Sequence, residues 1–155
     1  NLFFRELGFV IARGNPLSIR EFADLVREGV RFVNRQPGSG TRLLLDHRLE
    51  KAGIPSARIA GYDLEVFTHI EIGLAVLSGE ADAGIATAAV SSMLGLDFIP
   101  ITKERFDMIC DQSVFFQKGV QALVEVLTGD VFRKRVEGLG SYDFQSAGRI
   151  LYVKS

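Results

Sequence analysis

Short apolar runs alternate along the chain with stretches in which apolar residues recur at helical spacing. The apolar runs, which predict buried strands, are 7–12, 30–34, 82–86, 98–101 and 106–110. The predicted helices, with their capping residues, are 18–29, 43–52, 68–79, 87–94, 120–127 and 130–139. Strands that alternate with helices of about ten residues indicate an α/β fold, with a mostly parallel sheet and helices on both faces.

Capping residues mark several of the helix ends. Ser18 with Glu21, and Thr68 with Glu71, fit the capping box, in which a carboxylate three residues into the helix returns a hydrogen bond to the cap. Gly53 stands where a left-handed residue would end a helix. These local signals predict where the helices begin and end.

The bulk properties narrow the classes of protein. The chain has 155 residues and 47% hydrophobic content, which suits one module with a real core. A net charge of −1 gives no basic field for nucleic acid, so we expect no nucleic-acid contact. No apolar run reaches the length of a membrane span. The single cysteine, Cys110, excludes an internal disulfide and is expected in the core.

The start of the chain lacks an initiator methionine. Asn1 is followed almost at once by apolar residues, with no pattern of a signal peptide. We therefore expect the sequence to be a piece of a longer protein, and we expect that protein to be cytoplasmic.

A glycine-rich turn, Pro37-Gly38-Ser39-Gly40-Thr41-Arg42, connects a predicted strand to a predicted helix. Free N–H groups in a first helical turn carry the positive end of the helix dipole, and glycine lets a ligand approach the backbone closely. Ser39 and Thr41 add hydroxyl donors, and Arg42 adds a charged fork. The turn predicts a cradle for an oxyanion or carboxylate; an ordinary turn with a serine cap is the alternative. The nucleotide P-loop pattern is absent.

Two further segments are candidates for ligand contact. The strand of small residues at 82–86 ends in Ala86-Thr87, at the same edge of a parallel sheet as the glycine-rich turn, so backbone N–H groups there are expected to face a ligand. Close packing between a helix and a strand also needs small residues and is the alternative. Tyr62 is a weaker candidate, through a hydrogen bond from its hydroxyl.

Catalytic and metal sites find little support in the sequence. Ser39 as a nucleophile would need a base, and His47 lies two turns into the same predicted helix. The Gly-Ser-Gly here is not the nucleophile elbow of the α/β-hydrolases. His47 and His69 are isolated, without cysteines or paired carboxylates at ligand spacing. We therefore expect no catalytic residues, no metal and no cofactor in this chain itself.

The segment 32–46, with the sequence FVNRQPGSGTRLLLD, resembles a known family. It is similar to the periplasmic-binding-protein-like domain related to molybdate-binding proteins. That domain is found fused to helix-turn-helix regulators and to molybdopterin molybdenumtransferases. Further similar stretches are 61–63, 68–69, 78–84, 96–100 and 139–143. The resemblance extends from about Phe9 to Gly148.

The resemblance implies a type II periplasmic-binding-protein-like fold with two α/β lobes, the first of them incomplete here. The crossover strands between the lobes would be 7–12 and 106–110. The whole chain, 1–155, would be one module, in which 13–105 form the second lobe and 1–12 with 106–155 form the crossover strands and a remnant of the first lobe.

The resemblance also implies site residues. Ser39, Gly40, Thr41 and Arg42 correspond to the anion-binding loop of the family. Ala86 and Thr87 correspond to a strand-end loop that donates backbone N–H groups, and Tyr62 is a weaker match. The family commonly has tyrosine at the position of Phe106, so one hydroxyl is missing here.

The function implied is a small-oxyanion sensor within a larger protein. Molybdate, tungstate or sulfate would bind, and the lobes would close on the ligand. One alternative is an accessory domain of a molybdopterin molybdenumtransferase. Another is the effector domain of a transcriptional regulator with an organic ligand. A homodimer is a further expectation, because an incomplete first lobe would expose apolar surface.

Overall fold

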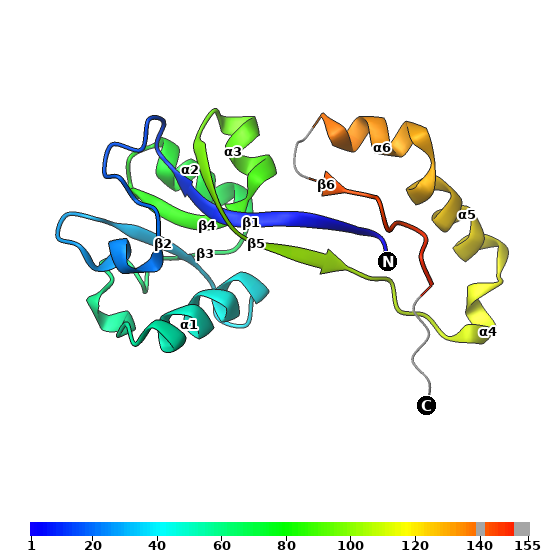
Figure 1. Cartoon of the computed structure of the whole chain (residues 1–155), viewed down its shortest axis with the longest axis horizontal. Helices are drawn as coiled ribbons and strands as arrows, with labels where there is room; N and C mark the ends of the chain where they lie inside the picture. Colours follow the sequence, from blue (N-terminus) through cyan, green and yellow to red (C-terminus); the bar gives the residue numbers. More distant parts are fainter. Residues whose placement is uncertain (139–141, 151–155) are drawn as a thin grey trace. The chain divides into compact units, whose positions relative to one another are not determined.

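A computed structural model describes residues 1–138 and 142–150 of the chain (Figure 1). The chain divides into two units, one of residues 7–102 and one of residues 1–6 with the chain from 103 onward. The boundaries between the two units fall inside the strands Phe3–Ile11 and Asp97–Phe106, whereas the sequence suggests that the second lobe begins at 13 and ends at 105. The physical reason is that residues 7–11 are held in the larger unit by pairing with a strand of that unit.

The larger unit contains most of a mixed sheet with the strand order β3-β2-β4-β1-β5. The strands are β1 (Phe3–Ile11), β2 (Phe32–Arg35), β3 (Glu65–Val66), β4 (Ala83–Thr87) and β5 (Asp97–Phe106). β2 is parallel to both β3 and β4, and β1 is antiparallel to β4. The predicted α/β class is confirmed, with its parallel part in β3, β2 and β4.

Helices cover both faces of this sheet, as predicted. Phe32 packs into a core with α1 (Gly40–Ala52), whereas its neighbour Val33 packs into a second core with α2 (His69–Leu77) and α3 (Ala88–Leu94). This alternation follows from the two-residue period of a strand. The consequence for function is that α1 lies on one face and α3 on the other.

The smaller unit contains short helices and a cluster of aromatic side chains. Its elements after β5 are α4 (Gln112–Phe115), α5 (Lys118–Thr128), α6 (Asp130–Glu137) and β6 (Tyr142–Asp143). β6 pairs with the first half of β1. The rings of the cluster belong to Phe3, Phe106, Phe132, Tyr142 and Phe144. These rings pack against one another as a separate small core.

The predicted helix at 18–29 is wrong. Only a short 3-10 helix, η1 (Phe22–Val26), forms there, and Glu21 is its N-cap. The side chain of Asn15 donates to the backbone carbonyl of Ile19 and accepts from its N–H, which holds the preceding chain in a loop. Ser18 has a φ of 51°, which a helix cap does not adopt.

The two predicted strands near residue 100 are also corrected. β5 runs without a break from 97 to 106, and residues 107–110 form no strand, so the predicted crossover at 106–110 is wrong. Cys110, expected in the core, is exposed. The sequence after Gly148 also allows a last strand or a tail over 148–153; residues 148–150 form no strand, and 151–153 lie outside the described residues.

The remaining helix boundaries follow the capping signals closely. The capping box of Thr68 and Glu71 is present at the start of α2. Gly53 ends α1 in the left-handed conformation with a φ of 65°. α1 begins at residue 40 rather than 43, because Ser39 acts as its N-cap. β3 and β6, of two residues each, were not predicted.

Candidate functional site

The carboxyl ends of β2 and β4 lie side by side, because these strands are parallel neighbours. The chain leaves β2 into α1 on one face of the sheet and leaves β4 into α3 on the other face (Figure 1). In open α/β sheets, this divergence of neighbouring strands is the place where ligands bind. The predicted site residues 39–42 and 86–87 follow these two strand ends.

The glycine-rich turn opens α1 as predicted. The Ser39 hydroxyl accepts a hydrogen bond of 3.1 Å from the backbone N–H of Arg42, which makes it an N-cap. Gly38 has a φ of 83°, a conformation that favours glycine. Over the described residues 1–138 and 142–150, the N–H groups of Gly40 and Thr41 have no hydrogen-bond partner. They are the free donors of the first helical turn.

Two of the three guanidinium nitrogens of Arg42 already donate hydrogen bonds to carboxylates. Its Nε donates to the two carboxylate oxygens of Asp46 at 3.1 and 3.2 Å, and its Nη1 donates to Glu65 Oε1 at 3.0 Å. Nη1 also contacts the Arg35 carbonyl oxygen at 3.4 Å. Arg42 is only 8% exposed. Two carboxylates therefore already engage this guanidinium, and its contact with an anion stays a prediction of the sequence.

Tyr62 belongs to the same cluster. Its hydroxyl donates to Asp46 Oδ1 at 2.6 Å, and the Arg42 guanidinium carbon lies 4.1 Å from its ring centroid. Burial raises the pKa of Tyr62, and the hydrogen bond to Asp46 raises it further. The Tyr62 hydroxyl therefore already donates to Asp46, and its contact with a ligand stays a prediction. We call Arg42, Asp46, Tyr62 and Glu65 the brace.

Thr87 closes β4 and is the N-cap residue of α3. Its side chain makes no capping hydrogen bond, and the residue is only 6% exposed. Thr41 is 5% exposed. Within the described part of the chain, neither hydroxyl has a hydrogen-bond partner in the protein. The hydroxyls of two buried threonines, one after β2 and one at the end of the neighbouring strand β4, thus have no hydrogen-bond partner among the described residues.

The small residues of β4 also serve packing. A Cβ on Gly84 would lie 2.6 Å from Ile72 Cγ2 and 2.9 Å from Val33 Cγ1. Ala86 is fully buried in the core beneath α2, so it can offer a ligand only its backbone. The packing explanation is therefore confirmed for Gly84 and Ala86, and ligand contact through the backbone of Ala86 and Thr87 stays a prediction.

Arg35, the last residue of β2, is a charged group at this edge that sequence analysis passed over. Its Nη2 donates to the Phe67 carbonyl oxygen at 2.7 Å and its Nε to Gln36 Oε1 at 3.1 Å. Hydrogen bonds from Thr68 hold the pKa of Glu71 below its usual value, and the charge of Arg35 adds to this effect. The position of Arg35 just before the glycine-rich turn is the sequence signal that could have identified it.

Phe106 lies in the aromatic cluster of the smaller unit. Its ring stacks on Phe3 with centroids 4.8 Å apart, and the Arg5 guanidinium carbon lies 4.5 Å above it. Arg5 also pairs with Glu104 at 2.9 Å. The phenyl ring at this position is accounted for by packing.

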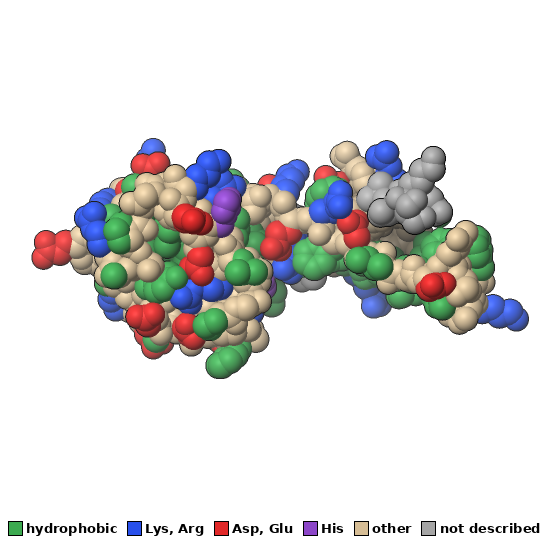
Figure 2. All heavy atoms as spheres, turned by 90° about the horizontal axis from the view of Figure 1, so that it is seen from below, with side chains coloured by type: hydrophobic (Ala, Val, Ile, Leu, Met, Phe, Trp, Pro, Cys, Tyr) green, Lys and Arg blue, Asp and Glu red, His purple; other side chains and the backbone are tan. Residues whose placement is uncertain are grey.

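Three further observations concern surface charge, metal-binding groups and the length of apolar helices. Basic and acidic side chains are interspersed over the face shown in Figure 2. Among the described residues, no group of three or more His, Cys, Asp or Glu side chains is arranged to hold a metal ion. No helix in the described ranges is long and apolar enough to cross a bilayer.

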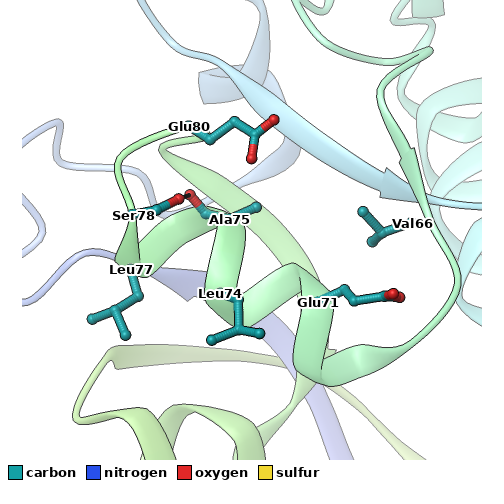
Figure 3. A pocket seen from close by; sticks show the side chains of 7 residues that line it. All are labelled: Val66, Glu71, Leu74, Ala75, Leu77, Ser78 and Glu80. Carbon is teal, nitrogen blue, oxygen red and sulfur yellow. Dashed lines mark hydrogen bonds between the residues drawn. The ribbon is translucent and has the colours of Figure 1, made fainter.

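A shallow groove of about 460 Å³ lies along α2 (Figure 3). Its lining residues are Val66, Glu71, Leu74, Ala75, Leu77, Ser78 and Glu80. It shares no residue with the glycine-rich turn or with Ala86 and Thr87. The groove is therefore separate from the predicted anion site.

Comparison with solved structures agrees with the fold. L-phospholactate-bound PEB3 superposes with a TM-score of 0.62 at 18% identity, over 92% of this chain and 66% of PEB3. The ancestral amino acid-binding protein AncCDT-1 gives a TM-score of 0.57 at 17% identity, over 86% of this chain and 57% of that protein. The "substrate binding domain of putative molybdenum ABC transporter" from Clostridium difficile gives 0.51 at 17% identity, over 92% of this chain and 65% of that one.

Sequence comparison gives the family. The uncharacterized protein YvgK of Bacillus subtilis (strain 168) is 32% identical over 97% of this chain, which spans only 48% of YvgK. An uncharacterized Clostridium pasteurianum protein, from the 5′ region of a ferredoxin gene, is 30% identical over 70% of this chain and 97% of its own length. Residues 1–128 match the PBP superfamily domain. The chain therefore belongs to the periplasmic-binding-protein (PBP) superfamily.

Proposed function

We propose that this domain binds a small oxyanion or carboxylate, with molybdate, tungstate and sulfate as the first candidates, and reports its presence to a larger protein. One observation carries the proposal. The N–H groups of Gly40 and Thr41 and the hydroxyls of Thr41 and Thr87 lack protein partners over the described residues, and they follow the neighbouring ends of β2 and β4.

Neutral donors of this kind are sufficient for an anion. Backbone N–H groups at the start of a helix point outward, and the helix dipole adds a partial positive charge there. The donors of α1 sit on a 13-residue helix capped at both ends, by Ser39 and Gly53. Because their positions are fixed before binding, little free energy is lost in ordering them.

An organic anion is the second candidate, for a specific reason. Phe67 is 70% exposed and lies beside the turn, because its carbonyl oxygen accepts from Arg35. Leu43, in the first turns of α1, is 62% exposed. Apolar groups next to an anion cradle suit a carboxylate or phosphate ester with an organic part. The solved neighbours named for phospholactate and amino acids are consistent with this class.

The biological consequence of ligand binding depends on the other domains of the larger protein. The chain spans about half the length of YvgK, so further domains are expected to carry the response. A fused helix-turn-helix domain would make this part a sensor for transcription. A fused molybdopterin molybdenumtransferase would make it an accessory domain of molybdenum-cofactor synthesis.

Isothermal titration of the full-length protein tests the proposal. Molybdate, tungstate, sulfate and phosphate form one set of titrants, and phospholactate and amino acids form the other. We expect saturable heat with at least one anion. Heat from the first set alone identifies an oxyanion sensor, and heat from the second alone identifies an organic effector. No heat with any titrant contradicts the proposed function.

A further inference from the structure

We propose that Arg42 is a positioning residue, which holds the first turn of α1 in its ligand-binding geometry and does not itself contact the anion. The inference rests on the proposed function only where it concerns affinity for the anion. The effect of Arg42 on the conformation of the turn can be measured without any ligand.

The charges of the brace argue against a direct contact. One guanidinium faces two carboxylates, Asp46 and Glu65, at 3.1 and 3.0 Å. The brace therefore carries a net negative charge, which repels an anion that approaches the Arg42 side chain. If the guanidinium turned away from Asp46 and Glu65 to contact an anion, the two carboxylates would lose their counter-charge next to the largely buried Arg42. This loss is unfavourable.

The contacts of Arg42 reach three segments that border the turn. Its backbone N–H donates to the Ser39 hydroxyl at 3.1 Å, at the start of α1. Its Nη1 contacts the carbonyl oxygen of Arg35, the last residue of β2, and the side chain of Glu65, the first residue of β3. The residues between 35 and 42 are therefore held at both ends by one side chain.

Tyr62 and Asp46 fix the guanidinium in turn. The Arg42 guanidinium carbon lies over the Tyr62 ring, 4.1 Å from its centroid, and the Tyr62 hydroxyl donates to the Asp46 oxygen that Arg42 Nε also contacts. Two planar groups and a shared carboxylate leave the guanidinium little freedom. Lysine keeps the charge of arginine but has neither its planar fork nor its stacking surface.

Hydrogen–deuterium exchange of the unliganded full-length protein tests the positioning role first. Arg42→Lys, Arg42→Met and Asp46→Asn are compared with Lys51→Ala, a control at an exposed position of the same helix. We expect faster exchange at residues 38–43 in Arg42→Met, a smaller increase in Arg42→Lys and none in Lys51→Ala. Unchanged exchange in Arg42→Met overturns the proposal. If Arg42→Met does not fold, Asp46→Asn replaces it, with the same expectation.

Binding titrations at several salt concentrations give the second measurement. A positioning role predicts that Arg42→Met weakens binding by about 10-fold to 100-fold, the range for residues that orient ligand-binding groups. The dependence of Kd on salt should stay that of the wild type in Arg42→Lys, because this variant keeps the net charge of the brace. A flatter salt dependence in Arg42→Met, with unchanged exchange, assigns Arg42 to the ligand and overturns the proposal. Absence of binding by the wild type contradicts the proposed function alone, since the exchange measurement stands without ligand.

Discussion

The Tyr62 hydroxyl donates a hydrogen bond of 2.6 Å to Asp46 Oδ1, and this contact joins the segment after α1 to α1 itself. The backbone carbonyl of Tyr62 also accepts from Asn34 Nδ2 at 3.0 Å, which connects the same segment to β2. Tyr62 thus stabilises the part of the fold from which the glycine-rich turn emerges.

Tyr62→Phe removes this hydroxyl and keeps the ring beneath Arg42. We expect a loss of about 1 kcal/mol in the free energy of unfolding, less than for a buried hydrogen bond to a charged group, because the Asp46 side chain is partly exposed to solvent. Thermal or chemical unfolding measures it, with Lys51→Ala as the control. A Tyr62→Phe variant as stable as the wild type would show that the hydrogen bond to Asp46 contributes nothing.

Thr41→Val and Thr87→Val test the two hydroxyls that have no protein partner in the described chain. Valine has nearly the same shape as threonine, and no internal hydrogen bond is lost, so we expect each variant to be at least as stable as the wild type. If the hydroxyls donate to the anion, each variant should bind it about tenfold more weakly, because a hydrogen bond to a charged group contributes about 1.5 kcal/mol or more. Titration together with a melting curve separates the two effects. Wild-type affinity in both variants would remove these hydroxyls from the site.

The ion pair of Arg31 and Asp82 predicts a pH dependence of stability. Asp82 accepts hydrogen bonds from the Arg31 backbone N–H, Nε and Nη2 at 2.8, 3.0 and 2.9 Å. The side-chain hydrogen bonds from Arg31 hold the pKa of Asp82 below its ordinary value of 3.8. A carboxylate whose pKa is lower in the folded state stabilises the fold above the unfolded pKa, and this contribution is lost as the pH falls through the folded pKa.

Asp82→Asn should therefore be less stable than the wild type at pH 7, by about 0.5–1 kcal/mol for a pair close to the surface. The difference should shrink as the pH falls below 3.8, where the wild-type carboxylate is increasingly protonated as well. Urea unfolding at several pH values measures this. A difference that stays constant down to acidic pH contradicts the assignment to the charge of Asp82.

How much of the fold could be predicted depended on the range of the interactions. The capping box of Thr68 and Glu71 spans three residues, so the sequence alone located the start of α2. The helix expected at 18–29 failed because the side chain of Asn15 bonds the backbone of Ile19. Such a hydrogen bond competes with the helix, and residue periodicity does not report it.

The candidate site shows the same limit. The turn and its N-cap Ser39 were predictable, because a strand, two glycines and a helix follow one another directly in the sequence. The role of Arg42 was not, because Glu65 reaches it only through the pairing of β3 with β2. A charged side chain beside a glycine-rich turn indicates ligand binding or bracing equally well until its partners are known.

Gly61→Ala is predicted to be the most damaging of these single changes to the fold. Gly61 has a φ of 87°, and a Cβ there would lie 2.0 Å from the carbonyl oxygen of Phe32 in β2. The backbone of β2 cannot yield without disturbing the strand that leads into the glycine-rich turn, so we expect a loss of about 3 kcal/mol or more. Gly53→Ala is the matched control, since its φ is 65° but no atom lies within 4 Å of the added Cβ. The control should lose only about 1 kcal/mol, the strain of a left-handed alanine. Equal melting temperatures for the two variants would show that the contact with Phe32 is not what requires glycine at position 61.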